Sequence, residues 1–206
     1  IIEPPHASIE RDLRWQANGE GHTIITVFDQ EYPAMLRESP GHPILLYVQG
    51  DVSLLQQPCV AVVGSRKAST QGLQTARIWS TRLASSGVPV VSGLAIGIDA
   101  SAHRGALDGS GPTIAVMATG PEHIYPRQHV GLANKILERG CLVTEFGLGA
   151  KLTRGNFPRR NRIMSGLAHA CLVVEAAQHS GSLITARWAL EQNRELLVVP
   201  GTADNP

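Results

Sequence analysis

The sequence has few aromatic residues, few cysteines and almost no net charge. Aromatic residues make up 4% of its 206 residues, there are three cysteines, and the formal net charge is +1. So few cysteines exclude a disulfide-stabilised extracellular scaffold. A charge near zero excludes a globally basic nucleic-acid binder, so any affinity for nucleic acid must come from local patches.

Long apolar segments, a signal-like start and metal-ligand spacings are also missing. We therefore predict a cytoplasmic protein with no membrane association, no cofactor and no metal site. Cys59, Cys141 and Cys171 each begin an apolar run, which indicates small buried thiols. A hydrophobic content of 43% with 17% charged residues is typical of a well-cored globular protein. Because the chain starts without methionine and ends abruptly at Pro206, we expect it to be part of a longer protein.

From Cys59 onward, apolar runs of strand length alternate with helical segments. We expect strands at residues 60–63, 88–91, 113–117, 142–144, 172–175 and 196–199. We expect helices at residues 72–86, 98–108, 129–139 and 182–192. This alternation predicts an α/β fold, an extended Rossmann-like doubly wound sheet that is mostly parallel and carries helices on both faces.

Residues 1–56 are less regular and are interpreted as a small N-terminal lead-in subdomain or an extension of the sheet. They contain strand-like runs at 24–27 and 44–48 and a short helical segment at 34–38. The Rossmann-like domain is then expected to span residues 57–206, with its C-terminal end truncated.

Five loops are expected at the carboxyl ends of the strands, where doubly wound folds bind their ligands. They comprise residues 64–66, 92–99, 119–126, 145–162 and 176–182. Most of the glycine-rich and basic motifs fall in these loops, which indicates a binding site at that edge of the sheet.

The longest of these loops contains the most basic stretch of the chain. Residues 154–162 read Arg-Gly-Asn-Phe-Pro-Arg-Arg-Asn-Arg, with four arginines, one phenylalanine and no acidic residue, and Lys151 extends the charge upstream. Guanidinium groups beside an aromatic ring suit phosphates and unstacked bases. The alternative is a solvated basic loop.

Two further motifs could hold phosphate. The first turn reads Gly64-Ser65-Arg66 rather than GxGxxG, and no acidic residue ends the next strand, which argues against a nicotinamide or flavin enzyme. The turn is either a phosphate cradle or a tight turn with an exposed arginine. Ser180-Gly181-Ser182 opens the last helix, a natural anion site, and Thr185 lies nearly one turn further in.

Acidic and histidine residues near these loops have both structural and catalytic interpretations. Asp99 and His103 lie on one helix face and could hydrogen-bond to each other, or belong to a Ser–His–Asp site with Ser101 or Ser92. The structural role is favoured. Glu145 and Glu175 could act in acid–base chemistry, and for Glu175 we prefer neutralisation of an arginine from the long loop.

Taken together, the motifs closely resemble those of the DNA-processing protein A (DprA or Smf) family, over almost the whole chain. They are residues 29–33 (DQEYP), 63–66 (VGSR), 92–95 (SGLA), 97–99 (GID), 102–103 (AH), 125–126 (YP), 156–162 (NFPRRNR), 180–183 (SGSL), 185–186 (TA) and 199–201 (VPG). Each motif alone is weak, but their order and spacing together are specific.

The resemblance implies a single-stranded DNA-binding protein that is not an enzyme. It also implies a homodimer that protects incoming DNA and helps load RecA recombinase during natural transformation. On this basis the expected nucleic-acid-binding residues are Gly64, Ser65, Arg66, Gly93, Gly97, Lys151, Arg154, Asn156, Phe157, Arg159, Arg160, Arg162, Ser180, Gly181 and Ser182. The expected supporting residues are Asp99, His103, Glu145, Asn161, Glu175 and Thr185; of these, Asn161 together with Arg159 and Arg162 could brace the loop against Glu145 or Glu175.

The sequence departs from the family pattern at three places. Arg154 stands where relatives can have lysine, residues 118–122 read Ala-Thr-Gly-Pro-Glu, and Gly147 stands where proline is expected. The chain also stops shortly after Gly201, before the helix in which relatives continue, so part of the dimer surface is expected to be missing.

Two other classes of function remain as alternatives. The Ser-Gly-Ser-Leu-Ile-Thr-Ala turn is similar to that of Rossmann phosphoribohydrolases, but the following helix has Ala186 and Arg187 where a catalytic glutamate is expected, and its next acid is Glu191. A purely structural or protein-binding domain would leave the gathering of basic and glycine-rich motifs at the strand ends unexplained.

Overall fold

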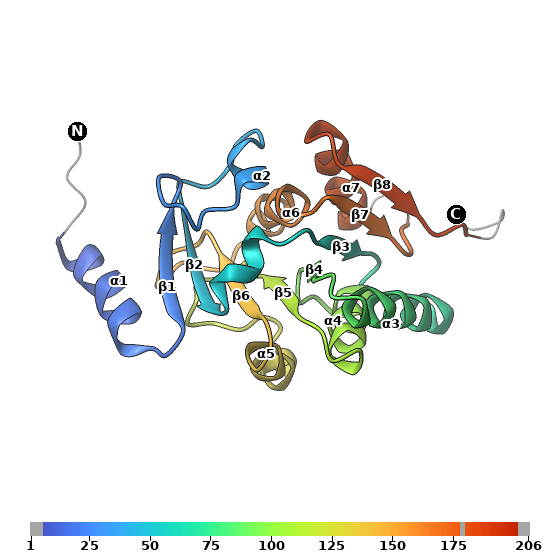
Figure 1. Ribbon diagram of the computed structural model, residues 1–206, viewed down its shortest axis with the longest axis horizontal. Coiled ribbons are helices and arrows are strands. Elements are labelled where there is room, and N and C mark those ends of the chain that lie inside the picture. The colour runs from blue at the N-terminus through green and yellow to red at the C-terminus, as the bar shows by residue number, and fades with distance from the viewer. Residues whose placement is uncertain (1–5, 178–179, 202–206) are drawn as a thin grey trace.

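One eight-stranded sheet runs through the molecule (Figure 1). The computed structural model describes residues 6–177 and 180–201. The strands are β1 (His22–Thr26), β2 (Leu45–Gly50), β3 (Val60–Val63), β4 (Val90–Ser92), β5 (Thr113–Val116), β6 (Cys141–Thr144), β7 (Ala170–Val173) and β8 (Glu195–Val198). They lie side by side in the order β1-β2-β6-β5-β4-β3-β7-β8.

The six strands from β3 to β8 are parallel, and β1 and β2 continue the same sheet in antiparallel pairing. The predicted mostly parallel doubly wound sheet is therefore confirmed, with strand bounds shifted by no more than two residues. In β2 the pairing with β6 brings Tyr47 opposite Thr144. The strand-like runs of the N-terminal region thus belong to the main sheet.

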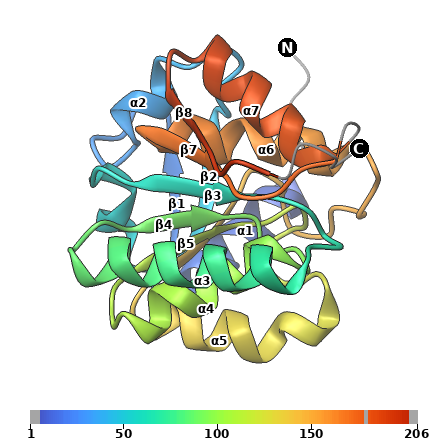
Figure 2. The same cartoon turned by 90° about the vertical axis from the view of Figure 1, so that its right-hand side faces the viewer.

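Helices cover both faces of the sheet (Figure 2). One layer holds α3 (Thr70–Ser85), α4 (Ile98–Asp108) and α5 (Val130–Leu137), and the other holds α6 (Asn156–Leu167), α7 (Gly181–Glu191) and the short α2 (Ala34–Arg37). Alternate residues of β3 serve the two layers, because Val62 packs in the cluster with α3 and α4 while Ala61 and Val63 pack in the cluster with α6 and α7.

Shorter elements complete the fold. The 3₁₀ helices η1 (Val52–Gln56) and η2 (Arg127–His129) precede β3 and α5. Helix α1 (His6–Asn18), which the sequence analysis did not predict, lies beside β1, where Trp15 stacks on the His22 ring with centroids 4.1 Å apart. Within the described parts of the chain, no helix has the length and apolar character needed to cross a membrane.

The basic stretch is not a long loop, and this prediction was wrong. From Asn156 onward it forms helix α6, and only residues 145–155 connect β6 to it. Pro158 is the third residue of α6, a first-turn position where the missing N–H has no intrahelical partner to lose. The arginines of this stretch therefore point in directions fixed by helical geometry.

The strand order reverses between β3 and β7. From β3 the chain passes through α3 to β4 on one side, whereas β7 and β8 lie on the other side of β3. Connections that diverge in this way leave a crevice at the carboxyl ends of the two strands, the usual ligand site of a doubly wound sheet.

Candidate nucleic-acid interface

A cleft of about 710 Å³ lies at this reversal point. Five segments line it: the turn after β3, the loop after β4 with the start of α4, the start of α6, the loop after β7 and the start of α7. We call it the large cleft. The predicted site residues that line it are Gly64, Ser65, Arg66, Asp99, Arg154, Phe157, Arg160, Asn161, Glu175, Ser180, Gly181, Ser182 and Thr185.

Arginine and phenylalanine side chains meet at the rim of the large cleft. Arg66 is exposed, and its Cζ atom lies 4.6 Å from the centroid of the Phe157 ring, the geometry of a cation–π contact. Arg154 and Lys67 are exposed and line the same cleft. Lys67 was not predicted, although its place next to Arg66 in a βα turn was a signal for it.

The turn after β3 contributes its side chains more than its amides. The Ser65 N–H donates to the Glu175 carbonyl at 2.7 Å, and the Lys67 N–H donates to the Ser65 hydroxyl at 3.0 Å. A Cβ atom at Gly64 would come within 2.9 Å of the Glu175 carbonyl oxygen, so this glycine permits close packing of the turn. The Arg66 guanidinium is therefore the main group that the turn offers to an anion.

The start of α7 forms the opposite wall of the large cleft. A helix N-terminus carries unpaired amides and a partial positive charge. The hydroxyls of Ser180 and Ser182 lie 2.6 Å apart at this end. Thr185 is only 1% exposed, and its buried hydroxyl has no hydrogen-bond partner among the described residues. These groups suit a phosphate oxygen as acceptor.

Arg160 lies beneath the cleft and is 3% exposed. Its Nη1 donates to the carbonyl oxygens of Gly93 and Val116, the latter at 2.9 Å, and its Nε donates to the Asn161 amide oxygen at 3.1 Å. Burial lowers the pKa of Arg160, and the nearby Asp99 carboxylate opposes that shift. These bonds tie α6 to the ends of β4 and β5.

Asp99 and His103 do not form the predicted hydrogen bond to each other. The Asp99 carboxylate accepts from the Ala95 N–H at 3.4 Å, and the His103 ring accepts from the Leu94 N–H at 3.3 Å. With Nε2 as the acceptor, Nδ1 carries the proton and donates to the Thr113 hydroxyl at 2.8 Å. Both side chains therefore hold the loop between β4 and α4.

Burial governs the titration of these two groups. It raises the pKa of Asp99, and the nearby Arg160 acts in the opposite direction. It lowers the pKa of His103 from 6.5 to about 3, with Arg160 and His129 adding to the effect. His103 is therefore neutral at physiological pH, as its acceptor role requires.

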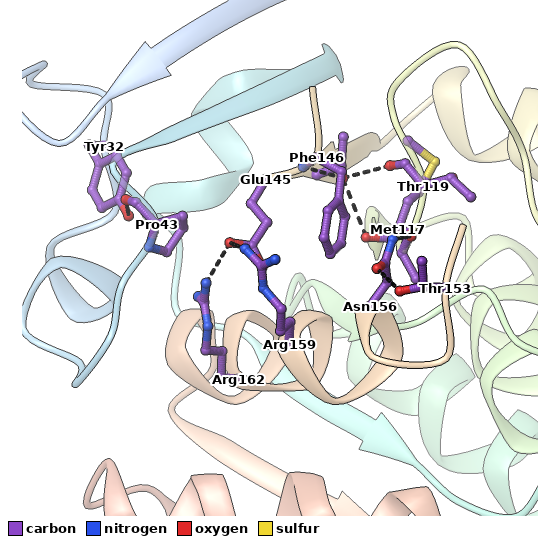
Figure 3. Close-up of polar contacts among 12 residues, drawn as sticks. Tyr32, Pro43, Met117, Thr119, Glu145, Phe146, Thr153, Asn156, Arg159 and Arg162 are labelled. Atoms are coloured by element: carbon purple, nitrogen blue, oxygen red, sulfur yellow. Dashed lines mark hydrogen bonds and ion pairs between the residues drawn. The ribbon is translucent and has the colours of Figure 1, made fainter. Parts of the chain in front are cut away.

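Glu145 is a second anchor for α6. Its Oε2 accepts from Arg162 at 2.5 Å and from Arg159 at 3.3 Å, and the carboxylate side chain is only 6% exposed (Figure 3). The Arg162 side chain is 12% exposed, whereas that of Arg159 is 61% exposed and lies over the Phe146 ring. Neither arginine lines the large cleft, because both turn toward Glu145.

Glu175 does not neutralise an arginine, contrary to the prediction. Its carboxylate accepts from the N–H of Ser69 at 3.0 Å and from the Ser69 hydroxyl at 2.6 Å. The Ser69 hydroxyl in turn accepts from the Gly72 N–H and caps α3. Glu175 therefore fixes the start of α3 beside the cleft.

The remaining predicted residues lie outside the large cleft. Gly97 (φ 80°) packs against the backbone of Ser65, where a Cβ atom would come within 2.3 Å of the carbonyl oxygen. The Asn156 amide donates to the Ala118 carbonyl at 2.9 Å. Its oxygen accepts from the Thr153 hydroxyl at 2.6 Å (Figure 3). Lys151 is exposed on the approach to α6. Gly93, whose carbonyl oxygen accepts from Arg160, lines a smaller cleft nearby.

Comparison with known proteins places the chain in a family. The profile of DNA recombination-mediator protein A matches residues 23–206. The chain belongs to this family. The resemblance inferred from the motifs is thereby confirmed.

Individual relatives agree with the family assignment. Protein Smf of Escherichia coli (strain K12) is 46% identical over 203 residues, which are 98% of this chain and 54% of that protein. The chain thus spans about half the length of that relative. The solved structure of DNA processing protein A from Streptococcus pneumoniae matches with a TM-score of 0.86 and 36% identity, over 99% of this chain and 74% of that one.

A second solved structure concerns nucleic acid directly. DNA processing protein A from Helicobacter pylori, described for its single-stranded DNA binding mode, matches with a TM-score of 0.81 and 28% identity. The match covers 89% of this chain and 83% of that one. The family and the fold of this chain are therefore those of DNA-processing proteins.

Proposed function

We propose that this chain binds single-stranded DNA in the large cleft and takes part in DNA processing. The observation that carries the proposal is the contact between Arg66 and Phe157 at the rim of a cleft with phosphate-binding groups on both walls. It places a cation that can bind a phosphate beside an aromatic ring that can stack on a base. The binding described for the Helicobacter pylori relative supports the same ligand class.

Phosphates are held by charge and by hydroxyl donors. Arg66, Lys67 and Arg154 are exposed cations on one side, and the mouth of α7 with Ser182 and Thr185 lies opposite. The two carboxylates that line the cleft already accept hydrogen bonds from Ser69 and Ala95, so they are less free to repel a phosphate. Binding is expected to be largely independent of sequence and to weaken steeply with salt.

A base is held by stacking on Phe157. The ring is half-buried, so its position is fixed while part of its surface is accessible. Stacking on an aromatic ring contributes about 1–3 kcal/mol per base and tolerates every base. This combination favours an unpaired strand, whose bases can unstack from one another and turn toward the ring.

The wider role is proposed from the family. We propose that in the cytoplasm the protein protects single strands taken up during natural transformation, helps load RecA recombinase onto them, and acts as a homodimer.

The phosphoribohydrolase alternative receives no support from α7. The first acidic residue in this helix is Glu191, its last residue. At 1.5 Å per residue it lies about 15 Å along the axis from the mouth of the cleft.

Fluorescence anisotropy with a labelled oligothymidine tests the site. Phe157→Ala and Arg66→Ala are each expected to lower the affinity well over tenfold, through loss of stacking and of a phosphate contact. Trp79→Ala and Arg82→Ala are matched controls, because these residues form a similar cation–π pair on α3 (5.8 Å) and line neither cleft. Near wild-type binding by both cleft variants would overturn the assignment.

A further inference from the structure

A second, smaller cleft adjoins the large one on the far side of Phe157. Its volume is about 80 Å³, and it shares Arg66, Ala95, Phe157 and Arg160 with the large cleft, so these residues separate the two. We call it the small cleft. Its lining is Arg66, Gly93, Ala95, Ile96, Ala118, Tyr125, Pro126, Phe157 and Arg160. Unlike the large cleft, it has no serine, threonine or carboxylate among the lining residues that the structure describes.

Tyr125 and Ile96 are exposed at the small cleft. Tyr125 is 49% exposed and Ile96 is 39% exposed, in a chain with few aromatic residues. The Tyr125 hydroxyl has no hydrogen-bond partner in the described part of the chain. The loop before Tyr125 is held by other hydrogen bonds, such as that from the Thr119 hydroxyl to the His123 carbonyl. The ring of Tyr125 is therefore presented to solvent without a structural need for its polar end.

The two aromatic rings offer separate stacking faces. The centroids of Tyr125 and Phe157 are 5.9 Å apart and their planes are tilted by 53°. A planar base lies flat on a ring, so one base cannot stack fully on both rings at this tilt. Two neighbouring bases of a flexible strand can each meet one ring, because the backbone of an unpaired strand turns freely between them.

We infer that the small cleft is a second base subsite, which takes one unpaired nucleobase stacked on Tyr125, next to the nucleotide whose base stacks on Phe157. This inference rests on the proposed function. The exposed Ile96 covers the edge of the base, and Arg66, which lines both clefts, lies between the two subsites, where the intervening phosphate passes. A base in a duplex has both faces stacked on its neighbours, so stacking on Tyr125 requires an unpaired base and the subsite selects single strands.

The inference is tested with Tyr125→Ala, Tyr125→Leu and Tyr125→Phe in the same chain. The alanine and leucine variants are expected to bind oligothymidine about tenfold more weakly, within the range for loss of one stacking contact. The phenylalanine variant is expected to bind as the wild type does, because it keeps the ring. The salt dependence of binding is expected to stay unchanged in all three, because no phosphate contact is removed. Unchanged melting temperatures of the three variants show that a loss of binding is not a folding effect.

A fluorescent base locates the subsite. A dinucleotide of thymidine and 2-aminopurine fills the two subsites in one register, so the wild-type protein is expected to quench 2-aminopurine at either of its two positions. Tyr125→Leu is expected to restore fluorescence at one of them, and Phe157→Ala at the other.

One result would refute the second subsite alone, and another would refute the proposed function together with it. If Tyr125→Leu binds as tightly as the wild type and keeps both quenched positions while Phe157→Ala fails to bind, the second subsite is refuted and the proposed function stands. If the wild-type chain binds no single-stranded oligonucleotide, the proposed function falls and the subsite with it.

Discussion

Helix α6 has two faces that use the same residue types differently. The face toward the large cleft presents Phe157, with Arg154 just before the helix, to solvent and ligand. One turn further along the same face, Arg160 is buried beneath the cleft, whereas another side of the helix places Arg159 and Arg162 against Glu145. One short basic stretch thus contributes to both binding and folding.

Helical periodicity produces the division. Arg159 and Arg162 are three residues apart, lie on one side of α6 and reach the same carboxylate (Figure 3). Arg160 is rotated by about 100° from Arg159, which turns it toward the strand ends. The comparison teaches that charge density along the chain does not measure charge at the binding surface.

The largest expected effect comes from Arg160→Ala. It leaves the carbonyl oxygens of Gly93 and Val116 without their donor and opens a cavity. We expect the free energy of unfolding to fall by about 3 kcal/mol or more. The melting temperature should then fall by about 6–12 °C. Urea denaturation and thermal unfolding measure the two quantities.

Arg159→Ala is the matched control, because it removes the neighbouring arginine from a largely exposed position. Its free energy of unfolding should change by about 0.5 kcal/mol or less. Equal stability losses in the two variants would contradict the division of α6 into a buried and an exposed face.

A smaller effect is expected from pH through His103. Its pKa is about 3 in the folded chain and 6.5 ordinarily, so between these values only the unfolded chain binds the proton. The free energy of unfolding is therefore unaffected by His103 protonation above pH 6.5, and below that it falls by about 1.4 kcal/mol for each pH unit. Urea denaturation between about pH 5 and 7 measures the slope.

His103→Gln isolates this contribution. The variant is less stable at neutral pH but should lose the His103 part of the slope. The raised pKa of Asp99 acts in the opposite direction and is common to both proteins. An unchanged slope in the variant would mean that His103 is not held neutral by its burial.

The smallest effect concerns the exposed cations. Arg154→Ala should lower single-strand affinity about fivefold, or about 1 kcal/mol, and reduce the salt slope by about 0.7. Arg159→Ala should lower it by less than about twofold, since Arg159 lies outside the cleft and is engaged by Glu145. Anisotropy titrations at two salt concentrations separate the cases, and equal losses in both variants would place the strand along α6 rather than in the cleft.

The sheet was more predictable than the site. Apolar runs such as Val60–Val63 are buried on both faces, so composition alone indicates a central parallel strand. The start of α6 was missed because Gly155, Pro158 and a run of arginines resemble a loop, whereas a proline in the first turn is compatible with a helix. The contact between Tyr125 and Phe157 was not predicted, because the two residues are 32 positions apart in the sequence.

The sequence alone determined the six parallel strands and helices α3, α4, α5 and α7 in chain order, the loops that meet at the carboxyl edge of the sheet, and the segments that carry charge there. These follow from local patterns of apolar residues, glycines and arginines. The tertiary structure decided which arginines are free, that Glu175 caps α3 while Glu145 holds α6, and that Tyr125 stands beside Phe157. Those outcomes depend on side-chain direction and on long-range packing, which a linear pattern does not contain.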